Sequence, residues 1–265
     1  MGKVITVLST KGGVGKSTLT KTMALVLEEM GNTICIIDLC QNSSISTGFL
    51  QDRDDYEYSS IDWLKGEIEP SKVIQRFQES SIYFIPSNEE IEDFSAYARK
   101  EFTAKSRIHC LEKKIQPLRN MFDYILIDTH PSENDDLVVY SIQASDHAII
   151  PMEVDLDSKL STRRSLEVLK EFVEEGLTYS IVPNKVSVTN MKLRRQLKRM
   201  EEEFIDLGMA KDVILSRIRY SDVVSTMKND NIILNQTENK YAKKIMNDYR
   251  VVTKEVIAKL EKGMF

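Results

Sequence analysis

The residues with the most specific chemical pattern form a glycine-rich loop near the N-terminus. The loop follows a short apolar run and opens a helical pattern, which is the setting that phosphate-binding loops require. Its glycines let successive backbone N–H groups point at phosphate oxygens, and the helix adds its positive N-terminal end. Lys16 can then reach the β- and γ-phosphates, and Ser17 can offer its hydroxyl to Mg²⁺. The residues expected to bind the nucleotide are Lys11, Gly12, Gly13, Val14, Gly15, Lys16, Ser17 and Thr18.

One departure from the ordinary phosphate-loop pattern concerns the start of this loop. Thr10 stands where the pattern has its first glycine, and Lys11 heads the loop instead. The segment Lys-Gly-Gly-Val-Gly-Lys-Ser resembles the deviant Walker A box of the ParA/MinD family of P-loop ATPases, and most closely the ParA-type DNA-partition proteins. In that family the first lysine reaches across a nucleotide-sandwiched dimer to the partner's phosphates, and Lys11 matches its position. The resemblance implies a homodimer that forms on ATP binding, with Mg²⁺ as the metal and with Lys11 and Lys16 as catalytic residues.

Later segments are similar to the same family. The apolar run that ends at Asp128 resembles the Walker B strand, so Asp128 is expected to hold the Mg²⁺ shell through water. Asn184 ends a segment that resembles the strand end whose asparagine contacts adenine. Arg219 belongs to a segment similar to the loop that closes over the base. His130 stands where the family usually has proline, and a harmless loop substitution is favoured over a contact with the nucleotide.

Cys40 is the main departure from the family pattern. The family typically reads Asp-x-Asp here. Asp38 matches the first aspartate and is also a candidate for the Mg²⁺ site. Cys40 replaces the second aspartate, which in the family is associated with orienting the attacking water. A thiol is a poor acceptor beside a carboxylate. Because catalysis in this class is mostly positioning and charge stabilisation, we expect weak hydrolysis rather than loss of ATP binding. Two explanations stay open: Asp38 with Gln41 or Asn42 positions the water, or the protein is an ATP-dependent dimer switch with little hydrolysis.

Basic residues gather in the C-terminal half, although 36 Lys and Arg against 41 Asp and Glu leave a net charge of −5. Such a balance argues against a uniformly basic nucleic-acid binder but leaves room for a local basic face. A solvated helix face is the simplest interpretation of any one cluster, whereas the ParA resemblance implies non-specific, salt-sensitive binding to DNA phosphates. The candidates are Lys192, Arg194, Arg195, Lys198 and Arg199; Arg217 and Arg219; and Lys243 and Lys244.

Short apolar segments alternate with longer helical patterns, which predicts a single α/β domain over residues 1–265. We expect a P-loop NTPase fold, in which a mostly parallel twisted sheet carries helices on both faces. Leu160, Leu166, Leu169 and Val173 predict an apolar helix face toward the sheet. The expected strands are 3–8, 33–38, 81–86, 123–128, 146–151, 178–182 and 213–218, with helices at 17–30, 159–175 and 191–204 and an exposed loop at 51–60.

These features favour a ParA-type ATPase for plasmid or chromosome partition. The resemblance implies a dimer that coats nucleoid DNA in the bacterial cytoplasm and is released when a centromere-binding, ParB-like partner stimulates slow hydrolysis. The loop begins at residue 11, so no DNA-reading domain is expected before it. A MinD-like membrane ATPase is the alternative. Membrane binding is not expected, because a stripe of Val252, Val256 and Leu260 more often packs on a domain than enters lipid.

Overall fold

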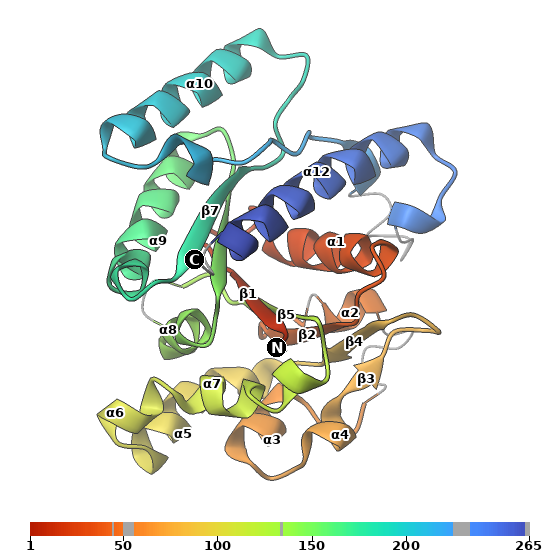
Figure 1. The fold of residues 1–265 in the computed structure, drawn as a ribbon, viewed down its shortest axis with the longest axis vertical. Helices are drawn as coiled ribbons and strands as arrows, with labels where there is room; N and C mark the ends of the chain where they lie inside the picture. The colour runs from red at the N-terminus through yellow and green to blue at the C-terminus, as the bar shows by residue number, and fades with distance from the viewer. Residues whose placement is uncertain (44, 50–55, 133–134, 225–233, 263–265) are drawn as a thin grey trace.

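The computed structural model describes residues 1–265 except 44, 50–55, 133–134, 225–233 and 263–265. Within the described residues, the chain builds a seven-stranded sheet with the order β3-β4-β2-β5-β1-β6-β7 (Figure 1). All neighbouring strands are parallel except β3 and β4, which are antiparallel. The strands are β1 (Lys3–Val7), β2 (Ile34–Leu39), β3 (Gln75–Arg76), β4 (Ile82–Ile85), β5 (Tyr124–Thr129), β6 (His147–Met152) and β7 (Thr178–Pro183).

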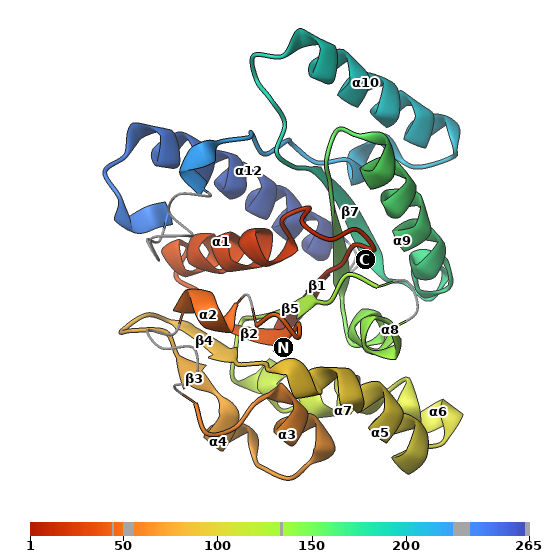
Figure 2. The same cartoon turned by 180° about the vertical axis from the view of Figure 1, so that it is seen from behind.

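Helices cover both faces of the sheet, because alternate residues of each strand point to opposite sides. Ile34 and Ile36 of β2 belong to the same apolar cluster as α1 and α12, whereas Cys35 and Ile37 pack with α3, α5, α7 and α8. The helices are α1 (Lys16–Glu29), α2 (Ser46–Phe49), α3 (Ser60–Lys65), α4 (Pro70–Val73), α5 (Phe94–Glu101), α6 (Ala104–Arg107), α7 (Cys110–Ile115), α8 (Asp136–Gln143), α9 (Leu156–Glu174), α10 (Met191–Asp206) and α12 (Lys240–Lys262). Figure 2, from behind, shows α1 and α12 on one side of the sheet and α10 at the edge of the molecule. The predicted α/β class with helices on both faces is confirmed.

The predicted strand over 213–218 is wrong. The segment runs beside β7, where Leu215 N–H bonds to Ile181 O and Ile218 N–H bonds to Pro183 O. These donors are three residues apart, whereas a regular ladder needs a spacing of two. The described chain therefore has only isolated bridges here, from Ile181 to Ile214 and from Val186 to Arg219.

The predicted apolar face of the helix after β6 is also wrong in part. Leu169 is buried, but Leu160 is 40% exposed and Val173 is 36% exposed. The buried face of α9 is instead made mainly of small polar residues, of which Ser161 meets the hydroxyls of Ser9 at 3.2 Å and Thr10 at 2.8 Å. Small side chains allow the helix to lie close to the loop that follows β1, which explains why a leucine pattern does not mark its inner face.

The two remaining apolar patterns agree with the structure. Leu193 and Leu197 lie four residues apart, a spacing that predicts an apolar stripe facing the sheet; Leu197 is buried on the inner face of α10, and Leu193 is half-buried. Val252, Val256 and Leu260 are buried in the cluster that joins α12 to α1. The C-terminal stripe therefore packs on the domain as expected, and no described helix has both the length and the apolarity to cross a bilayer. Of the expected exposed loop 51–60, residues 51–55 lie outside the described residues; at its end the prediction is wrong, because Ser59 caps α3, Ser60 begins that helix and both are buried.

His147, at the start of β6, makes stability depend on pH. Its side chain is fully buried; burial, with a smaller effect from Lys259, lowers its pKa to about 3. Below the ordinary value near 6.5 the unfolded chain takes up a proton that the folded chain does not, so stability is lost as the pH falls. We expect this residue alone to remove about 2 kcal/mol between pH 7 and pH 5. When the free energy of unfolding in urea is measured against pH, it should fall less steeply over this range in His147→Gln than in the parent, with the half-exposed His109→Gln as control. Equal pH dependence in all three proteins contradicts this.

Candidate nucleotide site

The glycine-rich loop joins β1 to α1 and forms one wall of a pocket of about 350 Å³. Gly15 has φ +94°, and a Cβ built there lies 2.4 Å from Nδ2 of Asn184. Asn184 in turn donates from Nδ2 to the carbonyl oxygen of Val14 at 2.7 Å. The pocket is lined by Gly12, Gly13, Gly15, Lys16, Ser17, Thr18, Cys40, Asn42, Pro131, Asn184, Lys185, Ile218, Arg219, Tyr220, Ser221, Val224 and Tyr249. Six of the eight predicted phosphate residues, all except Lys11 and Val14, thus meet the predicted base residues Asn184 and Arg219 at one pocket.

Lys16 lies at the base of this pocket and is 6% exposed. Its Nζ donates to the carbonyl oxygens of Ser9 and Lys11, both at 3.4 Å. Burial lowers the pKa of Lys16, while the charge of Asp128 opposes that shift. Both carbonyl contacts are long, so phosphate oxygens offer this ammonium group better acceptors than the loop itself provides.

Two carboxyl groups lie side by side at the ends of neighbouring strands. Asp38 of β2 is directly opposite Asp128 of β5 in the parallel register, and both are fully buried. Burial raises the pKa of Asp38 to about 7, with a further contribution from Asp128, and burial raises the pKa of Asp128 to about 6. Ser17 hydrogen-bonds Asp128. This oxygen-rich set fits a hard divalent cation such as Mg²⁺, whose charge favours the ionised carboxylates.

Asp38 is committed to its own loop. Its Oδ1 accepts from the Cys40 N–H at 3.0 Å, and its Oδ2 accepts from the N–H groups of Ile45 and Ser46 and from Ser46 Oγ. The side chain therefore shapes the turn that carries Cys40, and it is not among the residues that line the pocket. A role for Asp38 in positioning water stays a prediction.

Cys40 points toward the same carboxylates and lines the pocket. Its Sγ lies 3.7 Å from Oδ2 of Asp128. Burial and the neighbouring Asp128 and Asp38 charges raise the pKa of this thiol well above its usual value, so it stays a neutral thiol. Asn42 lines the pocket too, whereas Gln41 lines a separate hollow of about 310 Å³ together with His130. Of the two expected helpers of Asp38, the structure places Asn42, not Gln41, at the nucleotide pocket.

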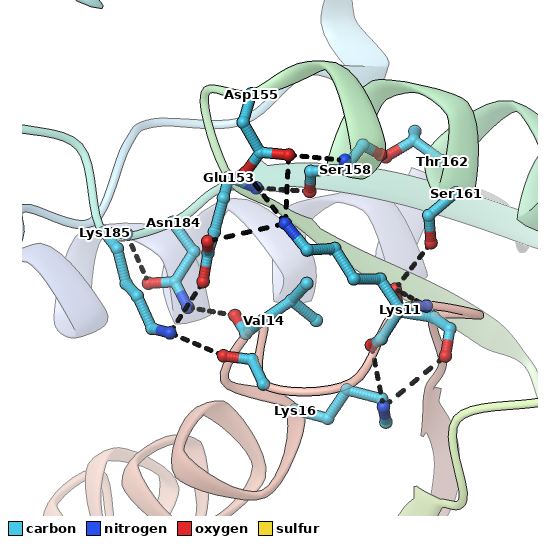
Figure 3. Close-up of polar contacts among 12 residues, drawn as sticks. Lys11, Val14, Lys16, Glu153, Asp155, Ser158, Ser161, Thr162, Asn184 and Lys185 are labelled. Atoms are coloured by element: carbon cyan, nitrogen blue, oxygen red, sulfur yellow. Dashed lines mark hydrogen bonds and ion pairs between the residues drawn. The ribbon is translucent and has the colours of Figure 1, made fainter.

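Lys11 does not line the pocket that its own loop forms. Figure 3 shows its Nζ turned toward the start of α9, where it binds Asp155 at 2.8 and 2.9 Å and approaches Glu153 at 3.7 Å. Lys185 bridges Glu153 to the carbonyl oxygen of Gly13. Glu153, Asp155 and Lys185 carry no motif of their own and are absent from the sequence prediction. Their position in the sequence could have indicated them, because they follow β6 and β7 and the carboxyl ends of parallel strands meet at one edge of the sheet.

The predicted DNA-binding residues fall into separate groups. Asn190 caps α10 through its Oδ1, and the helix seats Leu197 and Met200 on the cluster with β6 and β7. All five basic candidates on this helix are exposed, as are Arg217, Lys243 and Lys244. Arg219 differs, because its guanidinium forms a bidentate pair with Asp248 beside the nucleotide pocket. Figures 1 and 2 both show α10 apart from the first turn of α12, which carries Lys243 and Lys244.

The fold and the pocket together define a P-loop nucleotide-binding protein. Residues 2–181 match a protein family described as an AAA domain, and the chain belongs to the ParA/MinD family of P-loop ATPases. The septum site-determining protein MinD of Thermotoga maritima is 32% identical over 133 residues, which are 49% of this chain and 44% of MinD. The sporulation initiation inhibitor protein Soj of Bacillus subtilis is 25% identical over 198 residues, covering 74% of this chain and 76% of Soj. In the first three curated relatives the match spans only 44–57% of the relative's own length.

Solved structures share the fold over nearly the whole chain. The apo McdA of Cyanothece superposes with a TM-score of 0.81 and 20% identity, covering 97% of this chain and all of that one. A putative plasmid partition protein of Borrelia burgdorferi bound to AMPPNP gives a TM-score of 0.79 and 21% identity, covering 98% and 100%. At these identities the likeness establishes the fold alone.

Proposed function

We propose that the protein is a ParA-type ATPase that forms a homodimer around ATP and positions a cargo, such as a plasmid or chromosome, on DNA. The observation that carries the proposal is the placement of Lys11. This lysine heads the loop, yet its ammonium group lies outside the pocket of its own chain. A cation that heads the phosphate loop but lies outside its pocket supports a role at the phosphates of a second copy once its ion pairs with Asp155 and Glu153 have broken, and that role would join ATP binding to dimerisation.

The proposed hydrolysis is slow and uses Mg²⁺. Ser17 and Asp128 would hold the metal, which supplies charge neutralisation for the phosphates, and Asp38, whose oxygens accept bonds from its own loop, would add negative charge beside it. Lys16 then binds the β- and γ-phosphates, and Asn184 and Arg219 flank the base. A neutral thiol at Cys40 neither accepts a proton from water nor orients it strongly. The protein therefore rests for long periods as an ATP-bound dimer, until a ParB-like partner accelerates hydrolysis.

The proposed DNA surface is the exposed face of α10. Its apolar side is seated on the domain, so the basic side chains project outward. In a dimer two such helices double the local positive charge, which matters because phosphate binding grows with the number of neutralised phosphates. This surface provides for nucleoid association in a chain whose net charge is negative.

Alanine at Arg194, Arg195, Lys198 and Arg199 together tests the DNA surface. We expect the affinity of the ATP-bound protein for a random-sequence duplex at low salt to fall at least about tenfold, and the salt dependence to become shallower. The measurement is fluorescence anisotropy across a salt series, with ATPase rates recorded with and without DNA. The matched control replaces Lys72, Lys100, Lys105 and Lys113, four exposed lysines on α4 to α7. Equal losses in both variants, or no loss in either, reject α10 as the binding face.

Size-exclusion chromatography with ATP and with ADP tests the coupling of nucleotide to dimerisation. A dimer that needs ATP and Mg²⁺ supports the proposal, and a monomer under all conditions rejects it. Liposome binding addresses the MinD-like alternative. That alternative is disfavoured because Val252, Val256 and Leu260 are buried against the domain.

A further inference from the structure

The ion pairs around Lys11 form a network that ties the head of the phosphate loop to the start of α9. Lys11 Nζ contacts both carboxylate oxygens of Asp155, at 2.9 and 2.8 Å, and its second acceptor is Glu153 at 3.7 Å (Figure 3). Lys11 is not loosely solvated, because only 25% of its side chain is exposed. The ammonium group is thus bound at both carboxylates of its own chain.

We propose that Asp155 and Glu153 are positioning residues that hold Lys11 in its own protomer, and that this cis contact must break before Lys11 reaches a second copy. The inference rests on the proposed dimer function and adds its regulation. The two carboxylates compete with the partner's nucleotide for one ammonium group. A triphosphate offers more negative charge than a diphosphate, so the competition itself favours dimers that contain ATP over those that contain ADP.

Asp155 is suited to this role because it is already fixed in place. It is the N-cap residue of α9, and its Oδ1 accepts from the Ser158 N–H at 2.8 Å. Surface ion pairs are usually weak because the side chains lose conformational freedom when they pair. A side chain that is already held by a cap loses little further freedom when it binds a lysine. Partial burial of Lys11 alone disfavours its charge, yet the bond and charge of Asp155, with help from Glu153, leave the pKa of Lys11 raised.

Glu153 is fixed by a second lysine. Lys185 donates to Glu153 and to the carbonyl oxygen of Gly13, so this carboxylate is tied to the loop that holds the phosphates. The Lys185 N–H in turn donates to Oδ1 of Asn184 at 2.9 Å. Glu153 is therefore the weaker and shared acceptor of Lys11, and Asp155 is the principal one. Removal of Asp155 should have the larger effect of the two.

The variant Asp155→Asn isolates the contact, because asparagine is an equally good N-cap but carries no charge. We expect the ATP concentration for half-maximal dimer formation, measured by light scattering, to fall about fivefold. Glu153→Gln should give a smaller shift in the same direction. Asp157→Asn is the matched control, since Asp157 lies in the same first turn and acts on Lys11 only through its charge. Thermal unfolding checks that α9 is intact in each variant.

A second measurement tests the contact in the monomer, independently of dimerisation. The rate at which Lys11 is acylated by an amine-reactive reagent, followed by mass spectrometry, should rise about threefold or more in Asp155→Asn and stay unchanged in Asp157→Asn. An unchanged Lys11 rate overturns the inference even if the protein dimerises with ATP. A faster Lys11 rate in a protein that never dimerises supports the cis contact and rejects the proposed function. A dimer weakened by Asp155→Asn also overturns the inference, because Asp155 then stabilises the dimer.

Discussion

Replacing Gly15 with alanine is expected to weaken ATP binding about tenfold or more and to destabilise the protein by about 2 kcal/mol. The φ of +94° at this residue strains any side chain, and the new Cβ lies 2.4 Å from Nδ2 of Asn184. The asparagine must move, which breaks its buried bond to the Val14 carbonyl and removes the base candidate from its place. Isothermal titration with ATP and Mg²⁺, together with urea unfolding, measures the two effects.

Gly31→Ala is the matched control for this prediction. Gly31 follows Met30, the C-cap of α1; it has φ +86° and no heavy atom within 4 Å of a built Cβ. It therefore shares the backbone strain of Gly15 but not the steric conflict. We expect Gly31→Ala to lower stability by about 1 kcal/mol and to leave ATP affinity unchanged. If both variants bind ATP equally well, the contact between Gly15 and Asn184 does not shape the site.

Cys40→Asp is expected to raise the ATPase turnover number by about tenfold, because a carboxylate can orient and deprotonate the attacking water. The gain has a cost. The new carboxylate lies where Sγ is now 3.7 Å from Asp128, beside two carboxylic acids whose pKa values are already raised. We therefore expect the ligand-free variant to melt earlier than the parent and to regain stability when ATP and Mg²⁺ bind.

Cys40→Ser provides the control, since a hydroxyl replaces the thiol without adding charge. Its turnover should stay within about threefold of the parent, because a neutral hydroxyl orients water little better than a thiol. The measurement is phosphate release at saturating ATP, with and without duplex DNA. A turnover number for Cys40→Asp that is equal to or below that of the parent contradicts the assignment of slow hydrolysis to Cys40.

Much of the fold could be predicted because parallel strands leave a strong local signal. Strands β1, β2, β5, β6 and β7 are apolar runs that are buried on both faces, so their positions follow from composition alone. The prediction of a strand at 213–218 is wrong because the apolar residues of this segment give no information about the spacing of its hydrogen bonds. The prediction of the inner face of α9 is wrong for a related reason, because Ser161 packs against other hydroxyl groups and no apolar pattern marks this face.

The site shows the same division between local and non-local information. The phosphate loop is one continuous segment, so its chemistry can be read directly from eight residues. The opposition of Asp38 and Asp128 depends on strand order, and the loop bonds of Asp38 depend on how residues 45 and 46 turn back. The contact of Lys11 with Asp155 joins positions 144 apart in sequence. No spacing rule predicts such a pair without the structure.

The packing of α12 against α1 has a consequence for the order in which the protein is made. The first helix after the phosphate loop is covered by the last long helix of the chain, which also supplies Tyr249 to the pocket wall and Asp248 to Arg219. During synthesis the phosphate loop emerges well before α12, so the pocket lacks one wall until Tyr249 has emerged. Nucleotide capture, and any assembly that depends on it, therefore waits until α12 has been made and has packed against α1.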